Sequence, residues 1–177
     1  LVYLHGNASC RVESLSVLSL CLGLGLAVCA VDCAGSGHSD GEYVSLGYYE
    51  ADDAVAVVDY LKRAYGVEKY ALWGRSMGAA TALLYASGKK PDALAVVVDS
   101  PFASIKRLCY DLVHKVAARV PDGATMLAVR KIRRSVKHRT HFDIYDCNPE
   151  VTVKGCTTPA LLIHGHDDDF IRPDHSD

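Results

Sequence analysis

The stretch Gly74-Arg75-Ser76-Met77-Gly78 decides which fold the sequence predicts. It matches the pattern Gly-x-Ser-x-Gly and lies between an apolar strand predicted at Tyr70–Trp73 and a helix predicted from Met77 to Ser87. This strand–turn–helix setting is typical of a nucleophile elbow, a sharp turn that presents a serine hydroxyl at the end of a strand. The two glycines are expected to remove side chains that would clash where strand and helix approach each other. Ser76 is therefore the candidate nucleophile, although a serine that caps an ordinary helix would fit the same pattern.

Outward from this turn, further apolar segments predict strands that alternate with helices. Strands are expected at 2–4, 26–31, 94–98 and 160–163, and helices at about 12–22 and 48–65. Strands that are apolar throughout and separated by helices indicate a parallel sheet covered on both faces. We therefore predict one α/β domain over residues 1–177, with a doubly wound, mostly parallel sheet that is incomplete at both ends. In such sheets the chemistry collects at the carboxyl ends of the strands.

The region 105–142 interrupts this alternation with a helical pattern of its own. It predicts a small helical cap inserted over the pocket, and such a cap would influence the choice of substrate. Within it, the segment 130–139 contains six Lys or Arg in ten residues. The segment fits a solvated helix face, and it also fits a surface that meets anionic lipid or an acidic substrate.

Composition and charge narrow the classes of function. A net charge of −2 gives no reason to expect binding to nucleic acid. The seven cysteines form no CxxC pair and no zinc-like spacing, so we interpret them as reduced, structural thiols of a cytoplasmic protein rather than as a disulfide framework. Residues 14–31 carry no charge and fit a membrane helix, but Gly23 and Gly25 favour a helix followed by a short buried strand. The oligomeric state is left open.

His5-Gly6-Asn7 follows the first predicted strand, where a hydrolase with a nucleophile elbow carries its oxyanion loop. Such an enzyme needs N–H donors for the negative oxygen that develops in the reaction. We expect one donor at Met77, the residue after the candidate nucleophile, and the other at Asn7. Gly6 is expected to let the backbone turn back on itself, and His5 to make a structural hydrogen bond.

The motifs occur in an order that resembles the α/β-hydrolase superfamily from one end of the chain to the other, and most closely its serine aminopeptidase-like and acyl-thioesterase-like branch. They are His5-Gly6-Asn7, Asp32-x-x-Gly35-x-Gly37-x-Ser39, Gly74-Arg-Ser-Met-Gly78, Asp99-Ser-Pro-Phe102 and Ile163-His-Gly165-x-x-Asp168. The resemblance implies hydrolysis of esters, thioesters or amides through a Ser-Asp-His triad. It also implies that the reaction uses neither a metal nor an organic cofactor.

The resemblance assigns Asp168 as the triad acid, which would orient and stabilise the imidazole. Three adjacent aspartates also fit a solvated loop or a cation site, and Asp99 is a rival acid because it too follows a strand. The expected base is a histidine one helix and one strand further on, and no histidine occupies that place. His164 and His166 are expected to shape the acid loop, and His175 to begin the next helix and face away. We therefore favour a piece of a complete enzyme whose histidine lies beyond residue 177 over a pseudoenzyme.

Two functions from other classes are alternatives to hydrolysis. The loop Gly35–Gly41 follows a strand, as a dinucleotide-binding loop would, but Asp40 stands where the third glycine is needed and would repel a pyrophosphate. A non-catalytic binding or scaffold protein that keeps the hydrolase fold stays open. For a hydrolase, the expected substrate is a small acyl compound, with an ester or thioester ahead of a peptide amide.

Overall fold

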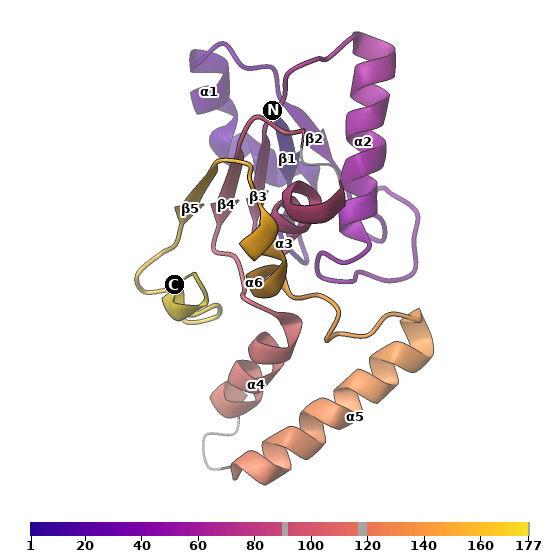
Figure 1. The fold of residues 1–177 in the computed structure, drawn as a ribbon, viewed down its shortest axis with the longest axis vertical. Helices are drawn as coiled ribbons and strands as arrows, with labels where there is room; N and C mark the ends of the chain where they lie inside the picture. Colours follow the sequence, from indigo (N-terminus) through magenta and orange to yellow (C-terminus); the bar gives the residue numbers. More distant parts are fainter. Residues whose placement is uncertain (90–91, 117–119, 177) are drawn as a thin grey trace.

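The computed structural model describes residues 1–89, 92–116 and 120–176, and its centre is a sheet of five parallel strands (Figure 1). The order across the sheet is β2-β1-β3-β4-β5, so the chain winds outward from β1 in both directions. The strands are β1 (Val2–Leu4), β2 (Cys29–Val31), β3 (Leu72–Arg75), β4 (Val96–Asp99) and β5 (Ala160–Ile163). The predicted α/β, doubly wound parallel sheet is confirmed.

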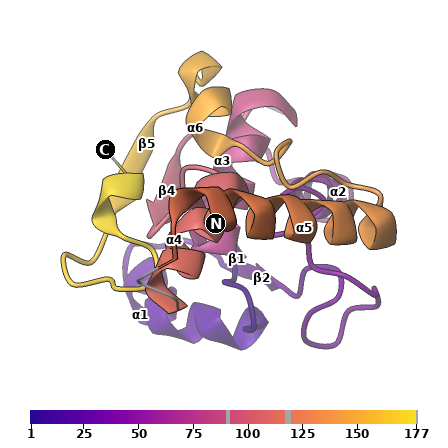
Figure 2. The same ribbon diagram turned by 90° about the horizontal axis from the view of Figure 1, so that it is seen from below.

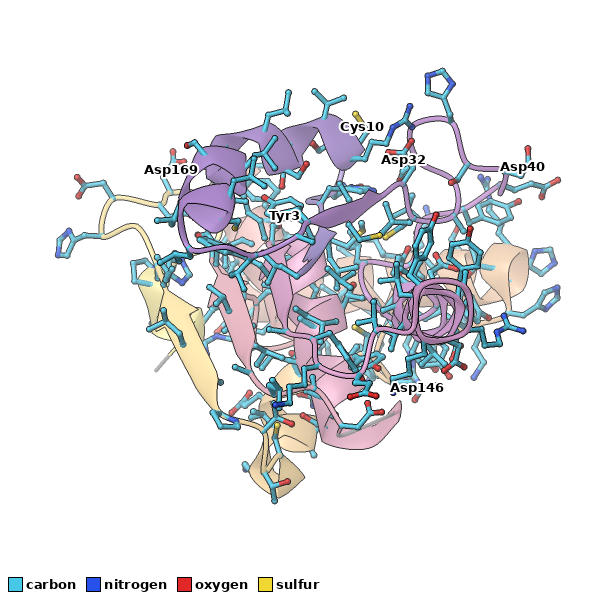
Figure 3. All side chains as sticks on the ribbon, turned by 90° about the horizontal axis from the view of Figure 1, so that it is seen from above. Tyr3, Cys10, Asp32, Asp40, Asp146 and Asp169 are labelled. Atoms are coloured by element: carbon cyan, nitrogen blue, oxygen red, sulfur yellow. The ribbon has the colours of Figure 1, made fainter. Side chains whose placement is uncertain are left out.

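Helices cover the two faces of the sheet unequally (Figure 3). One face carries α2 (Glu50–Tyr65) and α3 (Met77–Leu84), and α3 continues into the π-helical turn η2 (Tyr85–Lys89). The other face carries η1 (Arg11–Ser14) and α1 (Leu15–Gly23). Helix α2 begins with acidic residues, which its dipole favours, and ends where Gly66 adopts the left-handed conformation (φ 63°).

The core lies between the sheet and the α2–α3 face. Fully buried side chains of β1, β3 and β4 pack there, among them Leu4, Leu72 and Val98. On the opposite face α1 buries only Cys21 among its residues, and every residue of β5 is exposed. Both faces therefore carry helices, as predicted, but within the described residues the α1 face is covered only in part, because α1 alone cannot shield the width of a five-stranded sheet.

Several predicted boundaries shift by a few residues. The strands expected at 70–73 and 94–98 are found at Leu72–Arg75 and Val96–Asp99, since they pair in register up to Arg75 opposite Asp99. The charge-free segment 14–31 forms α1, a turn with Gly25 at φ 73°, and β2, as the preferred interpretation predicts. Across the described residues, no helix combines the length and apolar character that crossing a bilayer requires.

Beyond the carboxyl ends of the strands, α4 (Ile105–Val116) and α5 (Asp122–Thr140) project from the body of the domain (Figures 1 and 2). They occupy the region predicted as a helical cap; its role as a cap stays a prediction. A second apolar cluster, which includes Phe102, Ile105 and Phe142, joins their bases to Ala80 of α3. The chain then returns through α6 (Pro149–Thr152) and η3 (Val153–Gly155) to β5 and ends in the turn η4 (Pro173–His175).

Candidate active site

Ser76 occupies a strained turn between β3 and α3. Its backbone has φ 52° and ψ −112°, a left-handed φ that non-glycine residues seldom adopt. Two hydrogen bonds hold the turn: the Ser76 N–H donates to the Asp99 carbonyl at 2.8 Å, and the Ala80 N–H donates to the Ser76 carbonyl at 3.0 Å. The hydroxyl thus stands at the carboxyl edge of the sheet, between the end of a strand and the start of a helix.

The two motif glycines are required by close backbone approach, as the sequence predicts. A Cβ on Gly74 would lie 2.0 Å from the carbonyl oxygen of Gly78. A Cβ on Gly78 would lie 2.0 Å from the carbonyl oxygen of Leu4, so this second glycine allows α3 to approach β1 rather than β3. Both distances are far below any normal contact, and any larger residue would push α3 away from the sheet.

A hollow of about 460 Å³ brings the candidate groups together at the ends of β1, β3, β4 and β5. Its lining residues are Gly6, Asn7, Ala8, Glu13, Arg75, Ser76, Ser100, Asp168, Phe170 and Ile171. Ser76, Asn7 and Asp168 therefore share one cavity although they are distant in the sequence. The Met77 side chain is fully buried outside this lining.

The backbone N–H groups of Asn7 and Met77 are available to a ligand. Neither donates a hydrogen bond to any described residue, and Met77 opens α3, where helical N–H groups lack internal partners.

In the loop that follows β1, the residue with a positive φ is Ala8 (57°). Gly6 has an ordinary φ, and a Cβ there would meet only normal contacts of 3.5 Å or more. The expectation that Gly6 provides the turn is therefore wrong.

Glu13 holds this loop in place, although no feature of the sequence predicts that role. Its carboxylate accepts hydrogen bonds from the Gly6 N–H at 3.2 Å and from the Tyr3 hydroxyl at 3.0 Å. Burial, with the nearby negative charge of Glu13, raises the pKa of Tyr3. Glu13 belongs to the short turn η1 and to no motif, so no sequence signal marks it.

Of the three adjacent aspartates, Asp168 alone lines the hollow. Its Oδ1 accepts hydrogen bonds from the N–H groups of Phe170 at 3.0 Å and Ile171 at 2.9 Å, which fix the carboxylate. Its Oδ2 lies 3.7 Å from Nε2 of His164, beyond hydrogen-bond distance. The side chains of Asp167 and Asp169 are 101% and 88% exposed.

The rival acid Asp99 does not line the hollow. The Ser100 hydroxyl donates to its Oδ1 at 3.1 Å, and Arg75 Nε lies 3.9 Å from its Oδ2.

The glycine loop at residues 35–41 also has a structural explanation. The Arg11 and His38 N–H groups donate to the buried Asp32 carboxylate and lower its pKa. A Cβ on Gly37 would overlap that carboxylate at 2.3 Å, so glycine is needed there to make room for Asp32.

No histidine of the described residues lines the hollow. His5 joins β1 to β2 as predicted: Nδ1 bonds the Gly6 carbonyl at 2.8 Å, and the Cys33 N–H donates to Nε2 at 3.1 Å. His164 shapes the acid loop through the Ile171 carbonyl and the Ser176 hydroxyl, at 2.8 and 2.6 Å. His166 is fully exposed, and among the described residues its ring bonds Asp167 alone, so the expectation that it shapes the loop is wrong.

His175 lies in the turn η4 and does not line the hollow at Ser76. It is buried, accepts a hydrogen bond from the Ala103 N–H at 3.0 Å, and bonds Asp111 of α4 at 2.8 Å. Both ring nitrogens are therefore engaged. A second contact ties this end of the chain to α4, because Lys115 lies 3.1 Å from the Asp169 carboxylate.

The parallel sheet and the strained serine turn define the class of protein, which is an α/β hydrolase. A solved structure with this fold is the esterase Pf2001 of Pyrococcus furiosus. The two superpose with a TM-score of 0.74 at 26% sequence identity, over 99% of this chain and 63% of the esterase chain.

The chain belongs to the serine aminopeptidase, S33 family, whose family model matches residues 1–157. Among curated relatives, the uncharacterized protein YqkD of Bacillus subtilis (strain 168) is 33% identical, over 97% of this chain and 55% of its own length. The lysophosphatidylserine lipase ABHD12 of Macaca fascicularis is 31% identical, over 97% of this chain and 42% of its own length. The chain thus spans about half the length of the curated relatives it matches.

Proposed function

We propose that this protein is a serine hydrolase that cleaves a carboxylic ester through an acyl-enzyme on Ser76. The observation that carries the proposal is the strained φ of 52° at Ser76, on the wall of a hollow that Asn7 and Asp168 also line. Strain of this kind persists only where the surroundings hold it, and it clusters at functional sites. The relatives support an ester, because one is named an esterase and another a lipase. Thioesters and amides are the other substrate classes to test.

In the proposed reaction, the Ser76 hydroxyl oxygen attacks the ester carbonyl carbon while its proton passes to a general base. The N–H groups of Met77 and Asn7 would donate to the oxyanion that forms. The alcohol then leaves with the proton from the base, and the acyl group stays on Ser76. Water, activated by the same base, releases the acid and restores the serine. The positive end of the α3 dipole favours the negative oxygen beside Met77.

Asp168 is the proposed acid. Two backbone N–H groups hold its Oδ1, and its Oδ2 accepts no hydrogen bond from the described residues, so it is available to an imidazole. Since the described residues bring no histidine to the hollow, we place the base on a histidine C-terminal to Asp168 in the whole protein. That position agrees with the order serine, acid, histidine of the hydrolases that the motifs resemble.

The test uses a fluorophosphonate probe and a series of nitrophenyl esters on the whole natural protein. Ser76→Ala should abolish labelling, and Asp168→Asn should lower kcat by about 10⁴-fold. Asp167→Asn is the matched control, because its carboxylate points into solvent, and it should keep full activity. Labelling that survives Ser76→Ala would refute the proposal. A whole protein with neither labelling nor turnover would support the alternative, a binding or scaffold protein with this fold.

We also propose a cytoplasmic location. All seven cysteines are free thiols, as expected of a reducing compartment. Burial raises the pKa of Cys33 and of Cys147 to about 12, so both stay protonated and inert. Fractionation of cells and alkylation of the thiols in the lysate would test the location.

A further inference from the structure

Helix α5 turns a basic face to solvent. Thr125 and Val129 are its buried residues, and Arg133 on the same side makes a two-pronged ion pair with Asp143, at 2.6 to 2.9 Å. On the opposite side, four exposed residues follow one another at spacings of four, three and four, which places them in one row along a helix. We call this row the outer stripe; it consists of Leu127, Lys131, Arg134 and His138.

The cations of this face have no acidic partners. Arg130, Lys131 and Arg134 make no ion pair with any described residue, whereas Arg133 and Lys137 pair with Asp143. Asp122, at the first position, is the single acid in the sequence of α5. A merely solvated helix typically alternates opposite charges three or four residues apart, and α5 does not. The unpaired positive charge favours an anionic partner outside the chain.

Apolar side chains at one end of α5 indicate which kind of anionic partner the helix would bind. Leu127 is 64% exposed and Met126 is 41% exposed, and Val116, at the end of α4, is 88% exposed. Figures 1 and 2 show the end of α4 and the start of α5 at the tip of the pair that projects beyond the sheet. Exposed apolar groups beside cations are typical of a helix that lies in a membrane interface. A nucleic acid would pair its phosphates with the cations but would gain little from the exposed apolar side chains at this end of α5.

We propose that α5 docks on an anionic lipid surface, with Lys131 and Arg134 among the headgroups and Leu127 inserted beneath them. Helices α4 and α5 project from the carboxyl edge of the sheet, the edge where the Ser76 hollow opens. The inference deepens the proposed function, since docking would bring the hollow close to acyl esters held in a lipid layer. Docking itself needs no catalysis, so Ser76→Ala should bind lipid as the wild type does.

The test is flotation of the purified chain with vesicles of phosphatidylcholine, with and without phosphatidylglycerol. Binding should require the anionic lipid and should be lost in about 1 M salt, where charges are screened within about 3 Å. Lys131→Glu/Arg134→Glu should lower the partition coefficient at least about 30-fold, the effect of losing two basic residues at such a surface. Leu127→Ser should lower it about tenfold through lost apolar burial.

The matched control is Lys69→Glu/Lys154→Glu, which makes the same change in charge at two exposed residues that precede strands. It should bind like the wild type, and circular dichroism should confirm that all variants are folded. Equal binding to neutral vesicles, or an equal loss in the control, would overturn the proposal. So would tighter binding to double-stranded DNA than to anionic vesicles with no effect of Leu127→Ser, an outcome that indicates a nucleic acid partner.

Discussion

Replacing Gly78 with alanine tests the packing that shapes the turn at Ser76. The new Cβ would lie 2.0 Å from the Leu4 carbonyl oxygen and 2.9 Å from that of His5, whereas ordinary contact begins at 3.4 Å. Helix α3 must therefore move about 1.4 Å from β1, since both contacts are backbone atoms in a close-packed interior and no side chain can rotate away. An added methyl group in a packed core typically costs about 1–3 kcal/mol, and this overlap belongs at the upper limit, about 3 kcal/mol.

The assay is urea and thermal unfolding followed by circular dichroism. A loss of about 3 kcal/mol corresponds to a fall in Tm of about 6–12 °C for a chain of this size. Gly123→Ala is the control, because a Cβ there meets nothing within 4 Å, and in helix α5 it should stabilise by about 0.5–1 kcal/mol. If Gly78→Ala is as stable as Gly123→Ala, the close approach of α3 to β1 is refuted.

Three further predictions concern backbone strain and ionisation. Ser76→Gly should be about 1 kcal/mol more stable than Ser76→Ala in thermal unfolding, because glycine adopts a φ of 52° without strain; equal stability would contradict the strain. Burial lowers the pKa of His175, so the unfolded chain binds more protons and stability should fall as the pH drops below 6.5; His175→Gln should show a smaller loss of Tm between about pH 7.5 and pH 5.5. The Arg133 guanidinium lowers the pKa of Asp143, so Asp143→Asn should lower Tm at neutral pH, and the gap to the wild type should close as the pH falls below 3.8; a constant gap would contradict the pairing.

The order of elements was predictable because each strand is a run of apolar residues next to a turn. The ends of the strands were not, since a strand ends where its hydrogen-bonded partner ends. Arg75 and Asp99 are charged, yet they pair opposite each other as the last residues of β3 and β4. A strand predicted from a run of apolar residues therefore ends before Arg75 and before Asp99.

The candidate site was predictable where a motif follows a strand, which marked Ser76, Asn7 and Asp168 for the carboxyl edge of the sheet. The residues and backbone conformations that hold these groups in place were not predictable. Glu13 reaches the Gly6 N–H through a tertiary contact of a turn that carries no motif. The left-handed residue of the same loop is Ala8, and alanine gives no sequence signal for a positive φ.

The exposed strand β5 has a consequence for what can pair with the outer edge of the sheet. Within the described residues its one neighbour is β4, and Leu161 and Leu162 are 59% and 47% exposed on opposite sides of the strand. The N–H and C=O groups along its outer edge can template the addition of another strand, from a second molecule as readily as from the same one. Strand addition at this edge would bury apolar surface, so we expect β5 to pair with a further strand of the whole protein or with a strand of a second molecule.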